Sequence, residues 1–502
     1  DLCPSRLEKG RKPACVSTCP AGALVYDEFD SAIERVVTAR CTATCPAGIN
    51  VPRYVRAIGE GKYDEALAVI REANPLPSIC GRVCFAPCED TCRQGKQNEP
   101  IAIRMLKRFV TDKETEPRPE KVRVSPTGNR VAIIGSGPAG LTAAYYVAKM
   151  GHQVTIFEAL PEPGGMMRVG IPEYRLPRNV LNRDIKHIMN LGVEIRVNTR
   201  VESLDQLFEQ GYNAILVAVG AHRPVGIGVE GEDNPRVMDC LHLLREVSLG
   251  GSVNLGDKVI VVGGGNAAID ASRTALRLGS KEVVIAYPLP RSEMLASAEV
   301  TEAALEEGVK IEYLVAPSKI MGEGSKVRVE LTRMKLGAPD ASGRPRPEPI
   351  PGSEFTMDAD FIIAAIGQSP DIPKTFGLAI KRGNVLEVDG SLATSREGVF
   401  AAGDAVLGPA SVIEAIAQGK KVAVSIDKYL GGSGVLQTEK APPESPIARA
   451  DLVERMKERK RPTMPCISMD ARVNSFSEVE LGLTEEMAIE EGKRCLRCDL
   501  EQ

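Results

Sequence analysis

The chain has 502 residues, more than one domain usually holds, so we expect two or three domains. With 43% hydrophobic and 26% charged residues it has the composition of an ordinary soluble globular protein, and its formal net charge of −4 excludes a general attraction to nucleic acid or to an acidic membrane surface. The most apolar long stretch, residues 131–148, contains glycines and a proline and predicts a strand, a turn and a helix rather than a membrane span. We find no signal peptide in this sequence, and we expect a cytoplasmic location.

Cysteine is concentrated at the two ends of the chain. Of 13 cysteines only Cys240 and Cys466 lie in the middle. Core cysteines would be scattered, and disulfide scaffolds are usually short secreted chains, so we expect iron–sulfur ligands, with zinc as the next alternative and disulfides as the last. The candidate ligands are Cys3, Cys15, Cys19, Cys41, Cys45, Cys80, Cys84, Cys88, Cys92, Cys495 and Cys498.

The segment before the linker at 111–129 predicts iron–sulfur modules. Residues 1–30 contain CVSTCPAGAL, and residues 31–115 combine short helical patterns with the loop CGRVCFAPCEDTC; the resemblances described below imply a ferredoxin-like fragment for the first and a helical 4Fe–4S domain for the second. In that loop cysteines recur at every fourth position, but Gly81 and Pro87 favour a winding loop over one helix. Such a loop can wrap a cluster and direct N–H groups at its sulfur atoms.

From Arg130 onward strands and helices alternate, as in parallel-sheet domains. The motif GSGPAG, with Gly135, Gly137 and Gly140, follows an apolar strand and opens a helix. Its glycines permit a tight turn, approach of the backbone to a pyrophosphate and close packing of helix and strand. The next strand ends at Glu158, whose carboxylate can accept hydrogen bonds from ribose hydroxyls. We therefore expect FAD here; the alternative is a purely structural turn.

A second glycine motif, GGGNAA at 263–268, repeats this arrangement after the strand KVIVV. No acid stands at the tip of the following strand, EVVIAY, so recognition of a ribose is less clear than in the first unit. The motif predicts a site for a nicotinamide dinucleotide, and the alternative is a degenerate nucleotide fold that binds nothing.

Many ordered segments resemble one group of flavoproteins. They include CTATCPAGINVPRYV, CGRVCFAPCEDTC, GSGPAGL, GGMMRVGIPEYRLP, GGGNAAID, AAIGQSP and GVFAAGDA. From about Arg40 to Gly434 the chain resembles the small subunit of glutamate synthase, the FAD- and NADP-binding part of dihydropyrimidine dehydrogenase and the large subunit of NADH-dependent ferredoxin:NADP oxidoreductase. The resemblance implies an α/β fold with two Rossmann-like dinucleotide-binding domains, the nicotinamide domain being inserted in the FAD domain, after a helical iron–sulfur domain.

The implied domains are the two halves of the FAD domain at 129–224 and 366–435, the NAD(P)-binding domain at 225–365, and a C-terminal tail with a C-x2-C motif at 436–502. By position, the resemblance implies FAD contacts from Gly135, Gly137, Gly140, Glu158, Gly165, Arg175, Gly403, Asp404 and Val412. It implies nicotinamide contacts from Gly264, Gly265, Asn266, Ala267 and Gly367. The alternatives are a tight turn for Gly403–Asp404 and a surface salt bridge for Arg175.

One departure from the family concerns the choice of nicotinamide cofactor. The family usually has Tyr-Arg-Arg after the second strand of the nicotinamide domain, and these arginines bind the 2′-phosphate of NADP. Here Tyr287 is followed by Pro288 and Leu289, with Arg291 further on. A phosphate prefers a bidentate guanidinium, so we predict NAD(H) over NADP(H), and Arg291 keeps the alternative open.

The cysteine pattern also departs from the family. There a C-x2-C-x4-C-x3-C run and the later cysteine loop hold two 4Fe–4S clusters, but the first two cysteines of the run fall on Ile33 and Val36. We expect the tail pair to replace them, so that one cluster is held by Cys41, Cys92, Cys495 and Cys498. The other would use Cys45, Cys84, Cys88 and, as fourth ligand, Cys80, because Lys107 occupies the position of a Glu or Gln ligand in some relatives. The rival hypothesis is that the tail pair begins a cluster shared with a partner.

The N-terminal segment DLCPSRLEKGRKPACVSTCPAGAL resembles the end of a polyferredoxin electron-transfer subunit. Cys3, Cys15 and Cys19 match the last three cysteines of the pattern C-x2-C-x11-C-x3-C-P, whose first cysteine would stand immediately before Asp1. We therefore expect a longer chain with further clusters upstream. The alternative is a remnant with unligated thiols.

Together these features predict an oxidoreductase subunit that transfers electrons between NAD(H) and 4Fe–4S clusters through FAD. We expect no catalytic side-chain acid or base, and no dithiol mechanism, because neither nucleotide domain carries a C-x2-C motif. The expected partner is a redox subunit of the molybdenum, tungsten or hydrogenase type, or a ferredoxin, in a hetero-oligomer without nucleic acid or a membrane span. The alternatives are a glutamate synthase small subunit, a flavin-bifurcating enzyme and a passive electron relay.

Overall fold

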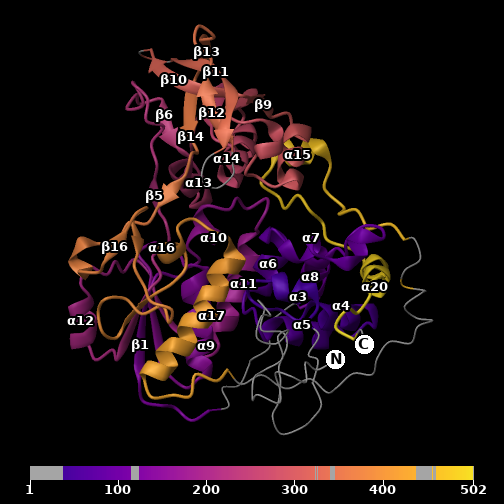
Figure 1. The fold of residues 1–502 in the computed structure, drawn as a ribbon, viewed down its shortest axis with the longest axis vertical. Helices are drawn as coiled ribbons and strands as arrows, with labels where there is room; N and C mark the ends of the chain where they lie inside the picture. The colour runs from indigo at the N-terminus through magenta and orange to yellow at the C-terminus, as the bar shows by residue number, and fades with distance from the viewer. Residues whose placement is uncertain are drawn as a thin grey trace, which may run out of the picture. The chain divides into compact units, whose positions relative to one another are not determined.

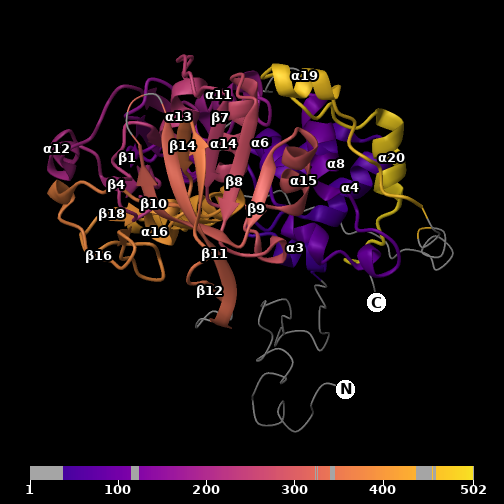
Figure 2. The ribbon, with the colours of Figure 1, turned by 90° about the horizontal axis from the view of Figure 1, so that it is seen from above.

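The computed structural model describes residues 38–114, 124–322, 324, 326–339, 345–436, 455 and 459–500 (Figures 1 and 2). The expectations for Cys3, Cys15 and Cys19 lie outside these ranges. The chain divides into two compact units, one of residues 1–116, 436–465 and 482–502 and the other of residues 117–435 and 466–481. The C-terminal tail therefore contributes to both units.

The first unit is helical. Short helices follow one another because capping and proline residues start them often: Asn50 accepts a hydrogen bond from the N–H of Arg53 at the start of α4, and Pro77 and Pro87 begin α6 and α7. The helices are α3 (Arg40–Thr44), α4 (Val51–Gly59), α5 (Tyr63–Arg71), α6 (Pro77–Val83), α7 (Pro87–Asp90), η1 (Arg93–Lys96), α8 (Ile103–Asp112) and α20 (Glu485–Lys493).

The cysteine loop is not one continuous helix. Cys80 lies in α6 and Cys88 in α7, and between these helices Ala86 adopts a left-handed conformation with φ 51°. The expected winding path is therefore made of two short helices joined by a sharp bend. Tail helix α20 packs against α4 so closely that a Cβ at Gly492 would lie 2.8 Å from the backbone nitrogen of Gly59.

The second unit contains a parallel sheet of five strands in the order β18-β4-β1-β2-β3. Its strands are β1 (Arg130–Ile134), β2 (Gln153–Phe157), β3 (Glu194–Arg196), β4 (Ala214–Val217) and β18 (Val399–Ala401). The last strand comes from late in the chain and pairs in parallel with β4. Helices α9 (Pro138–Lys149) and α17 (Val412–Tyr429) lie side by side at this sheet, as Figure 1 shows.

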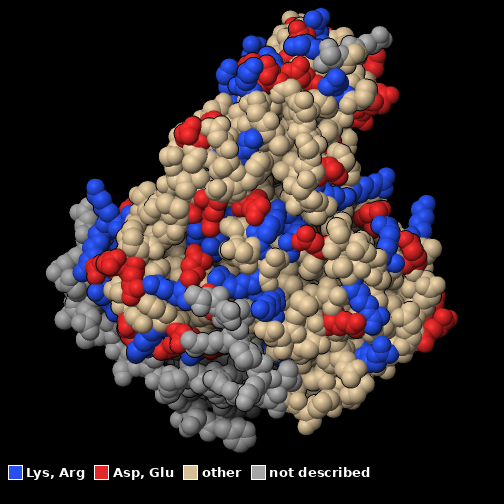
Figure 3. All heavy atoms as spheres, turned by 180° about the vertical axis from the view of Figure 1, so that it is seen from behind, with Lys and Arg blue, Asp and Glu red and all other residues tan. Residues whose placement is uncertain are grey.

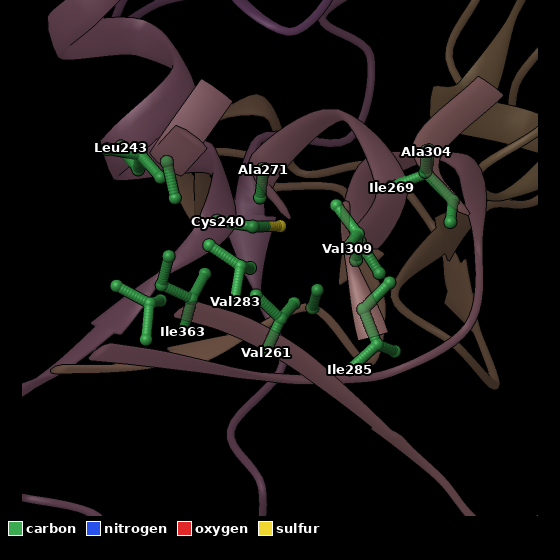
Figure 4. Close-up of a cluster of buried hydrophobic side chains, with 14 of the residues drawn as sticks. Cys240, Leu243, Val261, Ile269, Ala271, Val283, Ile285, Ala304, Val309 and Ile363 are labelled. Atoms are coloured by element: carbon green, nitrogen blue, oxygen red, sulfur yellow. The ribbon is translucent and has the colours of Figure 1, made fainter. Parts of the chain in front are cut away.

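A second parallel sheet has the order β6-β14-β7-β8-β9. Its strands are β6 (Val237–Asp239), β7 (Lys258–Val262), β8 (Glu282–Tyr287), β9 (Lys310–Tyr313) and β14 (Phe361–Ala364). Helices α13 (Cys240–Ser248), α14 (Asn266–Arg277) and α15 (Ala298–Glu306) belong to the same region. Figure 4 shows its core, in which Val261, Val283, Ile285 and Ile363 of the strands face Ile269 of α14, with the sulfur of Cys240 among them.

An antiparallel sheet of β10 (Val315–Met321), β11 (Val327–Pro339), β12 (Pro345–Pro349) and β13 (Phe355–Ala359) follows β9. The short strands β5 (Arg223–Pro224) and β15 (Gln368–Ser369) pair where the chain passes between the two parallel sheets. The remaining elements are α10 (Met166–Val169), α11 (Arg178–Met189), α12 (Leu204–Glu209), η2 (Arg291–Glu293), η3 (Lys374–Phe376), β16 (Ile380–Lys381), β17 (Val385–Leu386), α16 (Asp404–Leu407) and α19 (Met469–Asn474).

Two parallel sheets with helices, preceded by a helical unit, confirm the predicted α/β class with Rossmann-like domains. On the face drawn in Figure 3, basic and acidic side chains of the described residues are intermixed. Within the described ranges, every helix is too short or too polar to cross a bilayer.

Candidate functional site

The first glycine turn joins β1 to α9. Gly135 has φ 104°, and a Cβ there would lie 2.3 Å from the carbonyl oxygen of Ala218. A Cβ at Gly140 would lie 2.1 Å from the carbonyl oxygen of Gly135, whereas one at Gly137 would meet no atom within 4 Å. Gly137 directly precedes α9, whose first N–H groups have no partner inside the helix. Open space at the start of a helix is what a pyrophosphate requires.

Glu158 follows β2 and is buried beside this turn. One carboxylate oxygen accepts hydrogen bonds from the backbone N–H of Ser136 at 3.0 Å and from its hydroxyl at 2.5 Å, and the other accepts from the N–H of Leu160 at 2.8 Å. The hydroxyl of Ser136 in turn accepts from the N–H of Gly164 at 2.9 Å. Glu158 is thus held at the position expected of a ribose-binding acid, and Ser136 is a residue that the motif analysis passed over.

Two distant segments meet the same turn. Gly165 has φ 53°, and a Cβ there would lie 2.8 Å from the Cα of Gly137. Gly403 lies just after β18, and a Cβ at this position would lie 2.8 Å from the Cβ of Ala139 in α9. The sequence-predicted residues Gly135, Gly137, Gly140, Glu158, Gly165 and Gly403 are therefore gathered around one turn.

Asp404 and Val412 lie in the helices that follow. Asp404 is the first residue of α16, and one of its carboxylate oxygens accepts a hydrogen bond from the N–H of Ala410 at 3.3 Å. Burial raises the pKa of Asp404 to about 7. Val412 is the first residue of α17, where Ser411 and Glu414 form a reciprocal capping box.

Arg175 does not stand free beside the glycine turn. Its guanidinium forms two hydrogen bonds, at 2.9 and 2.7 Å, with the carboxylate of Asp270 in α14. The two side chains are 16% and 5% exposed, so the salt-bridge alternative describes this arginine, although the bridge is largely buried. It joins the segment before α11 to the helix that follows the second glycine motif.

The second glycine turn joins β7 to α14. A Cβ at Gly264 would lie 2.4 Å from the ring of Tyr287, so the turn packs directly against the end of β8. Gly265 precedes α14, and Asn266 is its first residue. The side-chain oxygen of Asn266 is buried and has no hydrogen-bond partner among the described residues. An unsatisfied acceptor beside a helix start fits a bound dinucleotide that donates to it.

Ala267 is the second residue of the same helix, and Gly367 accepts a hydrogen bond from the N–H of Val225 at 3.1 Å beside the β5–β15 pair. Arg291 is exposed and forms an ion pair with Glu302 of α15. The hydroxyl of Tyr287 donates to the backbone oxygen of Glu293 at 2.7 Å. Arg291, the arginine of this loop, thus already has a carboxylate partner.

Eight cysteines of the helical unit, which the sequence hypothesis divides into two sets of four, lie within its described residues. We call Cys41, Cys92, Cys495 and Cys498 the tail quartet. Burial raises the pKa of the Cys41 thiol, and the charges of Cys495, Cys92, Cys88 and Cys498 raise it further. Burial likewise raises the pKa of Cys495 to about 12, and Cys92 and Cys498 add to this effect. Thiols at opposite ends of the sequence are therefore close enough for their charges to interact.

The remaining four, Cys45, Cys80, Cys84 and Cys88, form the loop quartet. Burial and the charge of Cys84 raise the pKa of Cys80, with a smaller effect from Cys45. Burial raises the pKa of Cys88 to about 12, and Cys84 and Cys45 contribute. The charge of Cys88 also acts on Cys41, so the two quartets are neighbours.

The two quartets share a backbone feature. Two residues after Cys84, Ala86 has φ 51° and its N–H donates to the sulfur of Cys84 at 3.4 Å. Two residues after Cys495, Arg497 has φ 53° and its N–H is hydrogen-bonded to Cys495. Left-handed residues other than glycine are uncommon, and N–H groups directed at sulfur are typical of iron–sulfur loops.

No group of three or more His, Cys, Asp or Glu among the described residues is arranged to hold a single metal ion. A 4Fe–4S cube takes one cysteine on each of four irons, so its sulfur ligands stand farther apart than those around one ion. The chemistry of the donor set, four thiols in each quartet, fits such a cube.

Two further residues of this region were missed by sequence analysis. Tyr54 is fully buried, and its hydroxyl donates a hydrogen bond to the backbone oxygen of Ile103 at 3.2 Å. Burial raises the pKa of this hydroxyl, and the nearby thiols of Cys88, Cys45 and Cys41 raise it further. Lys107 was considered only as a non-ligand, yet it is buried beside the loop quartet. Neither position carries a local motif that would reveal its place near the cysteines.

Comparison with known proteins agrees with this geometry. The pyridine nucleotide-disulphide oxidoreductase family matches residues 129–419, and the family described as dihydropyrimidine dehydrogenase domain II, 4Fe–4S cluster, matches residues 33–118. The fold resembles that of FprA from Mycobacterium tuberculosis, with a TM-score of 0.53, 20% identity and coverage of 60% of this chain and 85% of the other.

Relatives are similar over most of the chain. The beta subunit of NADP(+)-dependent formate dehydrogenase from Moorella thermoacetica is 41% identical, covering 98% of this chain and 73% of the relative. The beta subunit of NADPH-Fe(3+) oxidoreductase from Geobacter sulfurreducens is 40% identical, with coverages of 90% and 73%. The small chain of NADPH glutamate synthase from Escherichia coli is 34% identical, with coverages of 76% and 86%.

The two glycine turns and the cysteine-bearing helical unit define a nucleotide-dependent redox protein. The chain belongs to the pyridine nucleotide-disulphide oxidoreductase family and is an NAD(P)H-dependent oxidoreductase. The predicted resemblance to the glutamate synthase small subunit is confirmed, and so are the predicted classes of cofactor, FAD, a pyridine nucleotide and 4Fe–4S clusters. The preference for NAD(H) over NADP(H) is not confirmed, because the names of these relatives specify NADP.

Proposed function

We propose that this chain is a diaphorase subunit that passes electrons between a nicotinamide dinucleotide and two 4Fe–4S clusters through FAD. The observation that carries the proposal is that buried cysteines from both ends of the chain influence one another's charge, in a chain that also holds two dinucleotide-type glycine turns. When bound, FAD would exchange hydride with the nicotinamide ring and single electrons with the clusters. The protein supplies binding, orientation and electrostatics.

For FAD, we propose contacts from Gly135, Gly137, Gly140, Glu158, Gly165, Gly403, Asp404 and Val412. The open start of α9 supports placement of the pyrophosphate there, and the buried carboxylate of Glu158 supports recognition of the ribose. Arg175 would contribute through its ion pair with Asp270, which ties the flavin-side segment to the nicotinamide-side helix.

For the nicotinamide dinucleotide, we propose contacts from Gly264, Gly265, Asn266, Ala267 and Gly367. The unpartnered side-chain oxygen of Asn266 supports this site. We retain NAD(H) as the proposed substrate, because Arg291 is paired with Glu302 and the residues after Tyr287 offer no guanidinium. The names of the relatives favour NADPH instead, and in that case Arg291 would exchange Glu302 for the 2′-phosphate.

For the clusters, we propose the tail quartet as the ligands of one cube and the loop quartet as the ligands of the other. The left-handed residues after Cys84 and Cys495 and their N–H groups support both assignments. Cys3, Cys15 and Cys19 remain proposed ligands of a further cluster. We also propose the domain boundaries given above, with the tail pair acting within the helical unit.

The proposed partner is the metal-containing subunit of a dehydrogenase in a hetero-oligomer, which we place in the cytoplasm. Relatives named as beta subunits of formate dehydrogenase and of an Fe(3+) oxidoreductase support a partner subunit. Ferredoxin is the alternative. The similarity to the small chain of glutamate synthase supports a glutamate synthase role. The tail quartet, which includes the C-terminal pair Cys495 and Cys498, favours the diaphorase role.

Native purification under anaerobic conditions followed by mass spectrometry tests the partner. Co-elution of a molybdenum, tungsten or hydrogenase-type subunit would support the proposal. Co-elution of a glutamate synthase large subunit would overturn it. A preparation whose flavin absorbance persists with both NADH and NADPH would instead support a passive relay.

A further inference from the structure

A buried cation lies at the loop quartet. Lys107 is 4% exposed, and no carboxylate among the described residues forms an ion pair with it. Its favourable charge interactions are with Cys84, Cys80, Cys88 and Cys45, the four members of the quartet. An ammonium taken out of water without a carboxylate is strongly unfavourable unless other negative charge compensates it.

Backbone contacts hold Lys107 in this position. Its neighbour Arg108 lies against α6 so closely that a Cβ at Gly81 would be 2.7 Å from the Cα of Arg108. Cys80 is the adjacent residue of α6, so the same contact brings together the backbone segments that carry Cys80 and Lys107. The close approach of the two backbones leaves α8 little freedom to rotate Lys107 away.

Arg104 fixes the same helix one turn earlier. Its guanidinium donates to the backbone oxygen of Arg82 at 2.8 Å, and its backbone N–H donates to the carboxylate of Glu89 at 2.8 Å. Arg82 and Glu89 flank the segment that carries Cys84 and Cys88. Helix α8 is thus tied to both sides of the cysteine loop, and Lys107 follows Arg104 on the same face of the helix.

The charge of the lysine has a defined electrostatic consequence. A 4Fe–4S cube with four thiolate ligands is negatively charged, and reduction adds one more negative charge. A fixed positive charge therefore stabilises the reduced form more than the oxidised form. Net charge, hydrogen bonds to sulfur and solvent exposure are the means by which proteins set such potentials.

We propose that Lys107 is a tuning residue whose buried charge raises the reduction potential of the cluster held by the loop quartet. The inference rests on the proposed ligand set and goes beyond it, because it assigns the lysine neither a bond to iron nor a proton transfer. A purely structural lysine, which only fills space between α6 and α8, would leave the potential unchanged when replaced by a neutral side chain of similar length.

The test is a redox titration followed by EPR on the anaerobically purified full chain, with iron counted in each sample. The variants are Lys107→Gln and Lys107→Met, which remove the charge, and Lys107→Arg, which keeps it. We expect the two neutral variants to lower the reduced-to-oxidised ratio of one cluster at least tenfold at a fixed potential, which is 59 mV for a one-electron couple. The Arg variant should stay close to the wild type, and the other cluster signal should move less.

Neutral variants with full iron content and unchanged midpoint potentials would overturn the inference, as would an Arg variant that shifts as far as the neutral ones. If both neutral variants lose iron, the Arg variant decides: retained iron supports a role for the charge, and lost iron contradicts it. A wild-type chain without cluster signals would contradict the proposed function itself, so the two failures are distinguishable.

Discussion

Replacing both Cys495 and Cys498 by serine should remove about four iron atoms from each chain. The two residues supply half of the tail quartet, and serine hydroxyls are poor replacements for thiolates on iron. The fold should survive, because α20 would still pack on α4 through Gly492 and Gly59, and the buried pair of Arg494 with Glu491 at 2.7 Å would remain. We expect a cost in stability of about 4 kcal/mol, because loss of a bound metal group is among the most destabilising changes.

The assay is iron determination per chain after anaerobic purification, combined with EPR of the reduced protein. Cys41→Ser should remove the same cluster signal as the tail variant, whereas Cys84→Ser should remove the other. Cys466→Ser is the matched control, since this cysteine belongs to neither quartet. Unchanged iron in the tail variant would refute the assignment and favour the rival hypothesis of a cluster shared with a partner.

Three further predictions concern the nucleotide-binding unit. Gly140→Ala should abolish flavin retention, since its Cβ would lie 2.1 Å from the oxygen of Gly135; an unchanged flavin-to-protein ratio would contradict the placement of FAD. Arg175→Ala should destabilise this unit by about 3 kcal/mol in denaturant unfolding, because it leaves the buried carboxylate of Asp270 unpaired; the double variant with Asp270→Ala should lose less. Burial raises the pKa of Asp404 to about 7, so between about pH 4 and pH 7 only the folded state keeps this proton. The free energy of unfolding of the flavin-free protein should therefore fall by about 1.4 kcal/mol for each pH unit as the pH rises through this range. Asp404→Asn should remove that slope, and parallel stability curves would contradict the raised pKa.

The glycine turns could be predicted from sequence because their determinants are local. A strand, three spaced glycines and a helix lie within about 20 residues, and the steric need of Gly140 is set inside the motif by the carbonyl oxygen of Gly135. Glu158 was found for the same reason. Ser136, which binds Glu158 in the structure, lies inside the motif but at a position that the pattern leaves open.

Long-range contacts were harder to predict. Nothing in the local sequence around Arg175 indicates that Asp270 holds it, because the two residues come from different parts of the nucleotide-binding unit. The proximity of Cys41 to Cys495 was expected only because the family pattern lacked a pair of cysteines there. The burial of Lys107 follows from the packing of α8 on α6, which hydrophobic periodicity does not reveal for a lysine.

Anaerobic mixing with NADH or NADPH, followed by visible absorbance and EPR, tests the central claim most directly. The account predicts that the flavin absorbance bleaches and that signals of reduced 4Fe–4S clusters appear, with a higher kcat/KM for NADH than for NADPH. Faster reaction with NADPH would reverse only the choice of nucleotide. Flavin absorbance that persists with both nucleotides, in a preparation containing FAD and iron, would contradict the proposed electron transfer.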